Sequence, residues 1–243
     1  MIRGRLTAWL AGVQARTEEA NRQAILRCLL PAPGGWLVDL GCGDGDFTLR
    51  LVERTAAARI TGLEMLEDRA LLAQARGIDV IRADLEAGLP FADGSLDVVH
   101  ANQVIEHVRD TDLLLREIRR VLAPRGQAVL STNNLAAWHN VVSLLAGLQP
   151  PPAHVSDEVI VGNPLSPAEG SAGARGHMHL RLFTGRALRE LAAHHGLALE
   201  HAETVGLYPL PPRAARLLLR LTPAHGAFLV QRYSRRAGHH PRR

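Results

Sequence analysis

The chain has 243 residues, of which 47% are hydrophobic and 21% charged. This excludes disordered, collagen-like and disulfide-framework chains and predicts a single domain over 1–243, possessing at most an insertion. Two cysteines, Cys28 and Cys42, cannot build a zinc cage and fit a reducing cytosol. With no signal-peptide pattern and no apolar run of about 18 residues, we expect a cytoplasmic protein without a membrane-spanning helix.

The charge is unevenly distributed along the chain. The formal net charge is +4, yet the residues from Thr204 onward contain eight arginines and no acid. This basic C-terminal segment, which ends in a tail over 237–243, predicts either peripheral contact with an anionic membrane surface or a solvated helix face with a frayed end. Because every basic residue is arginine, as a GC-rich coding bias would produce, arginine content gives no strong nucleic-acid signal.

Apolar spacing predicts the first elements in chain order. A helical pattern at 5–30 forms an N-terminal segment, 1–30, which Pro31, Pro33 and two glycines end. Apolar runs then alternate with amphipathic segments, which predicts parallel βαβ units and a doubly wound α/β sheet whose ligands bind at the carboxyl ends of the strands. The predicted strands are 36–40, 59–63, 80–83, 96–101 and 127–131, and the helices are 47–57, 66–76 and 111–122.

The pattern changes after the fifth strand. An apolar helix is predicted at 135–148, and the stretch 149–181 holds five of the fourteen prolines. A connection of this length is typical of a functional lid, so we assign 135–181 as a lid and acceptor region after strand 5. Beyond it we expect a helix from Thr184 to His195, strands at 197–205 and 227–233, and a short helix at 213–221.

A glycine-rich turn gives the strongest functional signal. The sequence VDLGCGDGDFT at 38–48 runs from a buried strand through three glycines into a helix. Glycines let a backbone approach a ligand, and a helix N-terminus presents free N–H groups. Asp46 stands where a dinucleotide fingerprint needs its third glycine, and Asp44 and Asp46 would repel a pyrophosphate. The loop therefore favours a cationic ligand without phosphate over the ligand of a nucleotide-binding oxidoreductase.

Together with three later motifs, this loop resembles the class I S-adenosylmethionine-dependent methyltransferases of the small-molecule group. The later motifs are Glu64 after the second strand, RADL at 82–85, and HANQVIEHV at 100–108, so the resemblance covers 36 to about 133. It implies a cofactor-binding half at 36–133 and a seven-stranded, mostly parallel Rossmann-like sheet with an antiparallel closing strand. It also implies S-adenosylmethionine as cofactor and a small acceptor, such as a sugar, a quinone or a lipid headgroup.

The resemblance assigns roles to particular residues. Glu64 would bind the ribose hydroxyls, Met65 would cover the adenine, and Asp84 would accept from the adenine amine. Asp39 would hold the methionine end or, as an alternative, brace the glycine turn. The complete set of cofactor-binding candidates is Asp39, Gly41, Cys42, Gly43, Glu64, Met65, Asp84, Leu85, Asn102 and His107.

Metal and base candidates follow the fourth strand and the lid. Some metal-dependent relatives use Glu-x-x-Glu-His and a later histidine, but here Gln103 replaces the first acid before Glu106 and His107. A neutral amide is a poor ligand for a hard dication, so we expect no metal and turnover that survives chelation. The candidate general bases are His139, His177 and His179. A non-catalytic S-adenosylmethionine-binding protein remains the alternative to a methyltransferase.

Overall fold

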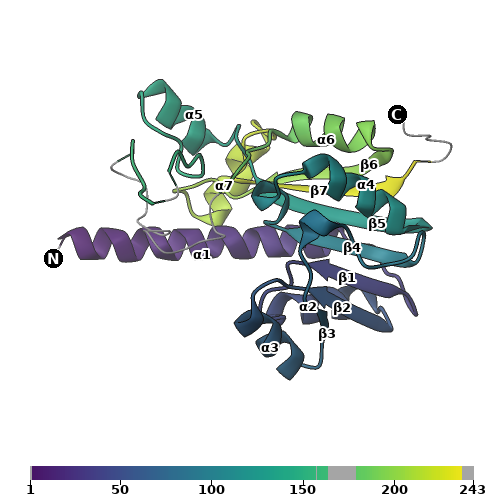
Figure 1. The fold of residues 1–243 in the computed structure, drawn as a ribbon. Helices are drawn as coiled ribbons and strands as arrows, with labels where there is room; N and C mark the ends of the chain where they lie inside the picture. Colours follow the sequence, from purple (N-terminus) through teal and green to yellow (C-terminus); the bar gives the residue numbers. More distant parts are fainter. Residues whose placement is uncertain (1, 157, 164–178, 237–243) are drawn as a thin grey trace.

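The computed structural model describes residues 2–156, 158–163 and 179–236, which form a seven-stranded sheet with helices on both faces (Figure 1). The strands are β1 Trp36–Leu40, β2 Arg59–Leu63, β3 Asp79–Ile81, β4 Leu96–Asn102, β5 Leu122–Asn133, β6 Leu197–Val205 and β7 Phe228–Arg235. The helices are α1 Ile2–Cys28, α2 Asp46–Thr55, α3 Glu67–Ala75, α4 Thr111–Val121, α5 Trp138–Leu145, α6 Gly185–His194 and α7 Pro212–Leu219. Two short 3-10 helices, η1 Leu85–Ala87 and η2 Ile105–His107, follow β3 and β4.

The strand order confirms the doubly wound, Rossmann-like fold. It runs β3-β2-β1-β4-β5-β7-β6, with parallel pairing from β3 to β5. The closing strand β7 is antiparallel to both of its neighbours, β5 and β6. The order reverses between β1 and β4, and in open sheets of this kind ligands bind outside the carboxyl ends at that point.

The start of β5 differs from the prediction. The strand begins at Leu122, which pairs with Leu96 of β4, and not at Gln127. Pro124 and Gly126 resemble breakers in the sequence, but the register shifts beside them and the strand continues. A Cβ at Gly126 would meet the carbonyl oxygen of Leu96 at 2.8 Å, so the glycine permits a close passage of the two strands.

Alternating side chains of the central strands face two different helix layers. Val99 of β4 packs in one cluster with Ile118 of α4 and Leu188 of α6. Its neighbour Val98 packs on the other face with Ile25 of α1 and Leu51 of α2. This period-2 pattern buries both faces of the sheet, as βαβ crossovers require. The carboxyl edge therefore remains as the place where a ligand can reach the sheet.

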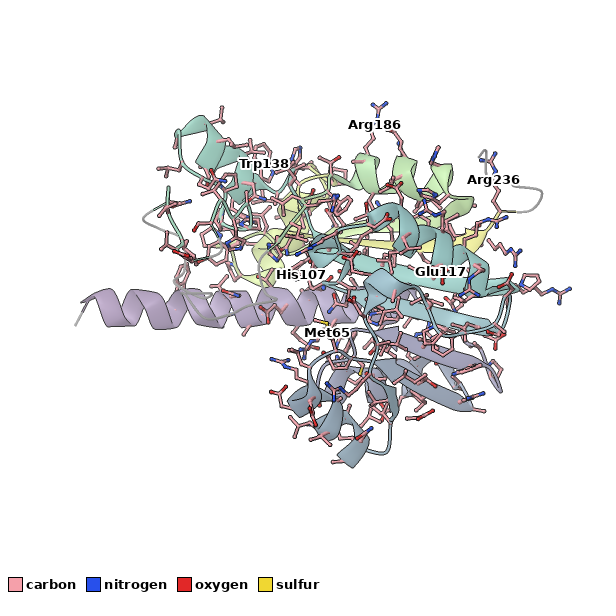
Figure 2. All side chains as sticks on the ribbon, viewed as in Figure 1. Met65, His107, Glu117, Trp138, Arg186 and Arg236 are labelled. Atoms are coloured by element: carbon pink, nitrogen blue, oxygen red, sulfur yellow. The ribbon has the colours of Figure 1, made fainter. Side chains whose placement is uncertain are left out.

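Side chains from several strand ends meet at this edge. In Figure 2, Met65 and His107 lie at the end of the sheet beside which α5 and α7 project, whereas Arg236 lies at the opposite end. Met65 comes directly after β2, and His107 ends the 3-10 helix that follows β4. The parallel strands thus bring together residues that are separated in the sequence.

The segment between β5 and α6 leaves and re-enters the sheet at one point. Asn134 and Phe183 form a parallel β-bridge, and the N–H of Leu135 donates to the carbonyl of Phe183 at 2.8 Å. Between them lie α5 and an irregular stretch, which agrees with an insertion after strand 5. His177 lies outside the described residues.

Among the residues that the structure describes, no helix combines the length and apolar character that crossing a lipid bilayer requires.

Deleting 237–243, which lie outside the described residues, should leave folding and cofactor affinity intact. The closing strand already ends at Arg235, and the N–H of Arg236 donates to the carbonyl of Gly196 at 2.9 Å. We expect the denaturant midpoint of the truncated chain to equal that of the full chain within error. A large drop in this midpoint would show that the tail packs on the domain.

Candidate functional site

The glycine turn between β1 and α2 is shaped for a close ligand. Gly41 and Gly45 have φ of 68° and 82°, and a Cβ at Gly45 would come within 2.5 Å of the Ile78 side chain. Both positions therefore require glycine. Gly45, at the start of α2, has no side chain to cap the helix, although the N–H of Asp46 donates to Oδ1 of Asp44 at 3.2 Å. The next amides of the first turn can still donate to a ligand.

Cys42 contributes to the turn through its backbone and its packing. Its N–H and that of Gly41 both donate to the carbonyl of Leu63 at the end of β2. The thiol is buried against Gly62, where a Cβ would meet the sulfur at 2.5 Å. Burial raises the pKa of this thiol to about 12, so Cys42 is a packing residue and not a nucleophile.

Glu64 is held in one position by two backbone donors. The N–H of Gly43 donates to Oε2, and the N–H of Leu66 donates to Oε1, each at 2.9 Å. The side chain is half-buried at the carboxyl end of β2. Each carboxylate oxygen keeps a further lone pair, so a fixed Glu64 can still accept from two neighbouring hydroxyls. This arrangement ties the glycine turn directly to the predicted ribose-binding acid.

Asp39 braces the core beneath the turn. Its Oδ2 accepts from the Thr48 hydroxyl at 2.6 Å, and its Oδ1 lies 2.7 Å from Nδ1 of His100. All three side chains are buried. These contacts agree with the bracing alternative. Each oxygen still keeps a lone pair, so a direct contact of Asp39 with the methionine end of the cofactor stays a prediction.

The predicted adenine end lies after β2 and β3. Asp84 accepts from the N–H of Glu86 at 2.9 Å and so caps η1, while its side chain remains exposed. Met65 is 57% exposed, and Leu85 is half-buried. Exposed apolar surface next to a free carboxylate oxygen suits the face and the amine of a purine.

Asn102 joins the site to the N-terminal helix. Its Oδ1 accepts from the amide of Asn21 on α1 at 2.9 Å, and Oδ1 of Asn21 accepts from the Ser131 hydroxyl at 2.8 Å. These two hydrogen bonds of Asn21 fix α1 across the ends of β4 and β5. Asn21 was not among the predicted site residues, although a buried amide on an otherwise apolar helix face indicates a specific partner.

A second group of polar side chains lies at the ends of β4 and β5. Glu106 of η2 is fully buried, and its Oε2 has no hydrogen-bond partner among the residues that the structure describes. Burial raises the pKa of this carboxyl to about 7. The carbonyl of Glu106 accepts from the N–H of Leu180 at 2.8 Å, which anchors the returning end of the insertion beside it.

His179 completes this group together with His107. The ligand atoms of Glu106, His107 and His179 all lie within 4.8 Å of one another, so these residues could hold a metal ion. Nδ1 of His179 lies 2.9 Å from the carbonyl of Pro152, which leaves the Nε2 lone pair facing the group. Burial lowers the pKa of His179 to about 4, so the ring is neutral at neutral pH, as a metal ligand must be.

The amide of Asn133 lies at the centre of this group. Its nitrogen is 2.8 Å from Oε1 of Gln103, 3.4 Å from Oε1 of Glu106 and 3.3 Å from Nε2 of His179. An amide nitrogen has two hydrogens and cannot satisfy three acceptors, and among the described residues Oε2 of Glu106 and the donor Nε2 of Gln103 have no partner. When Glu106 is ionised, its carboxylate and the lone pair of His179 can act as ligands of a cation. From now on we call Gln103, Glu106, His107, Asn133 and His179 the edge cluster.

A further candidate base lies on α5. His139 has Tyr208 as its ring neighbour, with centroids 6.0 Å apart, and burial lowers its pKa to about 4. The adjacent Trp138 stacks on His225, with centroids 4.6 Å apart, and donates to the Thr222 hydroxyl at 3.1 Å, so it packs α5 against the loop before β7. Of the three predicted bases, the structure therefore brings only His179 to the edge cluster among the residues it describes.

Comparisons with known proteins agree with this geometry. Residues 38–130 match the model of a methyltransferase domain. The chain is 31% identical over 173 residues to a probable S-adenosylmethionine-dependent methyltransferase of Mycolicibacterium smegmatis, covering 69% of this chain and 62% of that protein. It is 36% identical over 115 residues to the demethylmenaquinone methyltransferase of Thermus thermophilus, covering 45% of this chain and 52% of that protein. The chain spans about half the length, or less, of several curated relatives that it matches.

A solved structure extends the likeness to the whole fold. The putative methyltransferase of Haloferax volcanii, in complex with the Trm112 activator, superposes with a TM-score of 0.65 at 18% identity. The match covers 98% of this chain and 97% of that chain. At this identity the likeness shows the fold alone, including the region after β5 that the domain model does not reach. The glycine turn, the fixed acid after β2 and the matched domain together show that the chain belongs to the class I S-adenosylmethionine-dependent methyltransferases.

Proposed function

We propose that this protein transfers the methyl group of S-adenosylmethionine to a small-molecule acceptor. The observation that carries the proposal is the fixed position of Glu64, which the N–H groups of Gly43 and Leu66 hold next to an uncapped helix N-terminus. A ribose bound there would leave the methionine end toward Asn102, at the strand ends where the edge cluster begins. When bound, the cofactor supplies an electrophilic methyl group on a sulfonium.

The residues of this chain would contribute mainly by positioning. Gly41 and Gly45 let the backbone approach the cofactor, and Asn102 is oriented by Asn21. Holding donor and acceptor in line can account for a large share of the barrier reduction in a displacement reaction. The insertion after β5 ends beside Glu106, and we propose that it closes over the acceptor and excludes water.

We further propose that Glu106, His107 and His179 bind a divalent cation, and we thereby revise the expectation of a metal-free site. The position of the first acid still holds the neutral Gln103, but ligand atoms of Glu106, His107 and His179 lie within 4.8 Å of one another, which supports a site with three protein ligands. One carboxylate and two imidazoles favour a borderline transition metal over magnesium. When bound, such an ion would supply positive charge next to the acceptor. In this role His179 is a ligand rather than the general base.

The acceptor class is a small molecule with an oxygen, nitrogen or carbon nucleophile. Sugars, quinones and lipid headgroups all satisfy this description, and the Thermus relative is named for a quinone. We place the activity in the cytoplasm, because free thiols at Cys28 and Cys42 fit a reducing compartment.

Calorimetry with S-adenosylhomocysteine and NAD tests the proposal directly. We expect S-adenosylhomocysteine to bind and NAD to give no heat, because the acidic turn at Asp44 and Asp46 opposes a pyrophosphate. A screen of acceptors with labelled methyl donor then tests transfer. Cofactor binding without transfer to any acceptor would favour the non-catalytic alternative, and NAD binding would contradict the cofactor assignment.

A further inference from the structure

A large groove lies away from the edge cluster, between α1 and α7. Its volume is about 560 Å³, which is in the range of small-molecule sites. The α1 residues in the lining run from Arg16 to Arg27, in the C-terminal half of that helix, and Figure 1 shows α7 next to this part of α1. The end of β6 and the loop after it also line the groove. The apolar part of the lining consists of Ala20, Val205, Leu207, Leu210, Ala215 and Leu219.

Helix α7 is attached to the domain by few apolar side chains. Leu207, Ala215 and Leu219 form a small cluster of their own, separate from the two clusters that sandwich the sheet. The outer surface of the same helix exposes Leu217 and Leu218, at 64% and 43%. Apolar side chains thus occur both on the groove side of α7 and on its outer surface.

Arginines without acidic partners surround this apolar lining. Arg16 of α1, Arg216 of α7 and Arg220 directly after α7 line the groove, and none of them forms an ion pair with a residue that the structure describes. Arg216 and Arg220 are one helical turn apart, a spacing at which like charges repel. The groove therefore carries positive charge that nothing in the described chain offsets.

The two acids in the lining are already engaged. Glu19 accepts from Arg50 at 2.8 and 3.1 Å, and the hydrogen bond with Arg50 lowers the pKa of this carboxyl to about 2. Glu203 pairs with Arg27 at 3.1 Å. Because both carboxylates have cationic partners of their own, they do not neutralise Arg16, Arg216 or Arg220.

We propose that this groove binds an anionic phospholipid of a membrane surface, with an acyl chain along the apolar lining and the phosphate near Arg216 and Arg220. Arginines beside apolar side chains complement a molecule that has a negative head and an apolar chain. A soluble ligand would cover the groove but not Leu217 and Leu218 on the outer surface of α7. A bilayer covers both, because exposed leucines of an interfacial helix enter the region between headgroups and chains.

The arginines of the basic C-terminal segment lie in different parts of the fold. Arg232 and Arg235 belong to β7 inside the sheet, and Nη1 of Arg235 donates to the carbonyl of Leu122 at 3.3 Å. Of the arginines in this segment that the structure describes, Arg216 and Arg220 line the groove. Membrane contact would therefore run through α7 and not through the segment as a whole.

Vesicle co-sedimentation of the full chain tests the proposal. Vesicles of phosphatidylcholine with about one third phosphatidylglycerol should bind the protein, with binding that falls as salt rises, and pure phosphatidylcholine vesicles should not. Arg220→Glu should weaken the partition constant by about 30-fold, because charge reversal removes two favourable charge units near the surface. Arg125→Glu is the matched control, since Arg125 is exposed in the early part of β5, away from the groove lining.

A second pair of variants tests the groove itself. Ala20→Trp places a large side chain in the groove and should reduce binding roughly tenfold or more through loss of the acyl-chain contacts. Ala15→Trp adds the same bulk at an exposed position of α1 outside the groove lining and should bind as the unmodified chain does. Circular dichroism confirms that all variants are folded.

Three results would overturn the proposal. Equal binding to neutral and anionic vesicles would remove the role of the arginines. Unchanged binding by a folded Ala20→Trp protein would remove the role of the groove. Uptake of a monomeric anionic amphiphile, such as a fluorescent fatty acid, without any vesicle binding would replace the membrane lipid by a soluble ligand.

Discussion

His179→Ala should remove a bound divalent cation and slow methyl transfer by at least about 10- to 100-fold, the loss that removal of even an outer partner of a metal ligand causes. The imidazole is held by the carbonyl of Pro152, so its Nε2 position is fixed relative to Glu106 and His107. Alanine leaves the carboxylate of Glu106 without one of its two imidazole neighbours. Metal content after dialysis against manganese or zinc, measured by mass spectrometry, reports the binding directly, and labelled-methyl transfer reports the rate.

Two further variants separate the cation from a general base. Glu106→Gln keeps the volume of a fully buried side chain and removes its charge, so we expect a folded protein without the cation. His154→Ala is the matched control, because His154 lies beside His179, with ring centroids 5.2 Å apart, but is not among the three grouped ligands. It should keep both the cation and the rate.

Chelation of the unmodified protein is the most direct test against the cation proposal. If the unmodified protein turns over at the same rate after exhaustive chelation, and Glu106→Gln binds as much metal as before, the cation proposal is wrong. A slow His179→Ala variant would then identify His179 as the base. A slow His139→Ala variant would instead indicate that the acceptor binds near α5 and Tyr208.

Much of the fold could be predicted because β1, β2 and β4 are short, mostly apolar runs bounded by turn residues. β2 and β6 have the predicted bounds, and Gly34 and Gly77, at φ of 76° and 84°, mark turns before β1 and β3. The early start of β5 could not be predicted, because Gly126 acts there through its missing side chain against Leu96. That contact exists only in the assembled sheet.

The cofactor-binding half of the site could also be predicted from the sequence, because its residues directly follow predicted strands. Glu64 comes after β2 and Asn102 ends β4, so strand ends alone place them at one edge. The edge cluster could not be predicted in the same way. Glu106 and His179 belong to distant segments, and they meet because the N–H groups of Leu180 and Arg181 bind the carbonyl of Glu106. A local motif reports only the Gln103 to His107 part of that group.

Asp39 shows why a motif does not settle the role of a side chain. The sequence left two roles open, holding the methionine end or bracing the turn. The bracing partners, Thr48 and His100, come from the next helix and from β4. The contact with His100 joins residues 61 positions apart, so a local motif could not show it.

Glu64→Ala should weaken S-adenosylhomocysteine binding by about 1.5–3 kcal/mol, the usual worth of hydrogen bonds to a charged group. This corresponds to roughly a 10- to 150-fold rise in Kd. The substitution removes the predicted acceptor of the ribose hydroxyls and also releases the N–H groups of Gly43 and Leu66. Both effects act in the same direction, because a glycine turn without its anchor must be ordered when the cofactor binds.

Glu67→Ala provides the matched control for this change. Glu67 is an acid of the same loop-to-helix junction, but it is exposed and forms an ion pair with Arg82 at 3.2 Å on the surface. Its removal should leave the Kd within about twofold, since exposed ion pairs contribute little. Calorimetric titration of both variants, with circular dichroism to confirm folding, gives the comparison. Equal affinity of folded Glu64→Ala and Glu67→Ala proteins would show that the acid after β2 does not bind the ribose, and the cofactor would then have to lie elsewhere along the carboxyl edge.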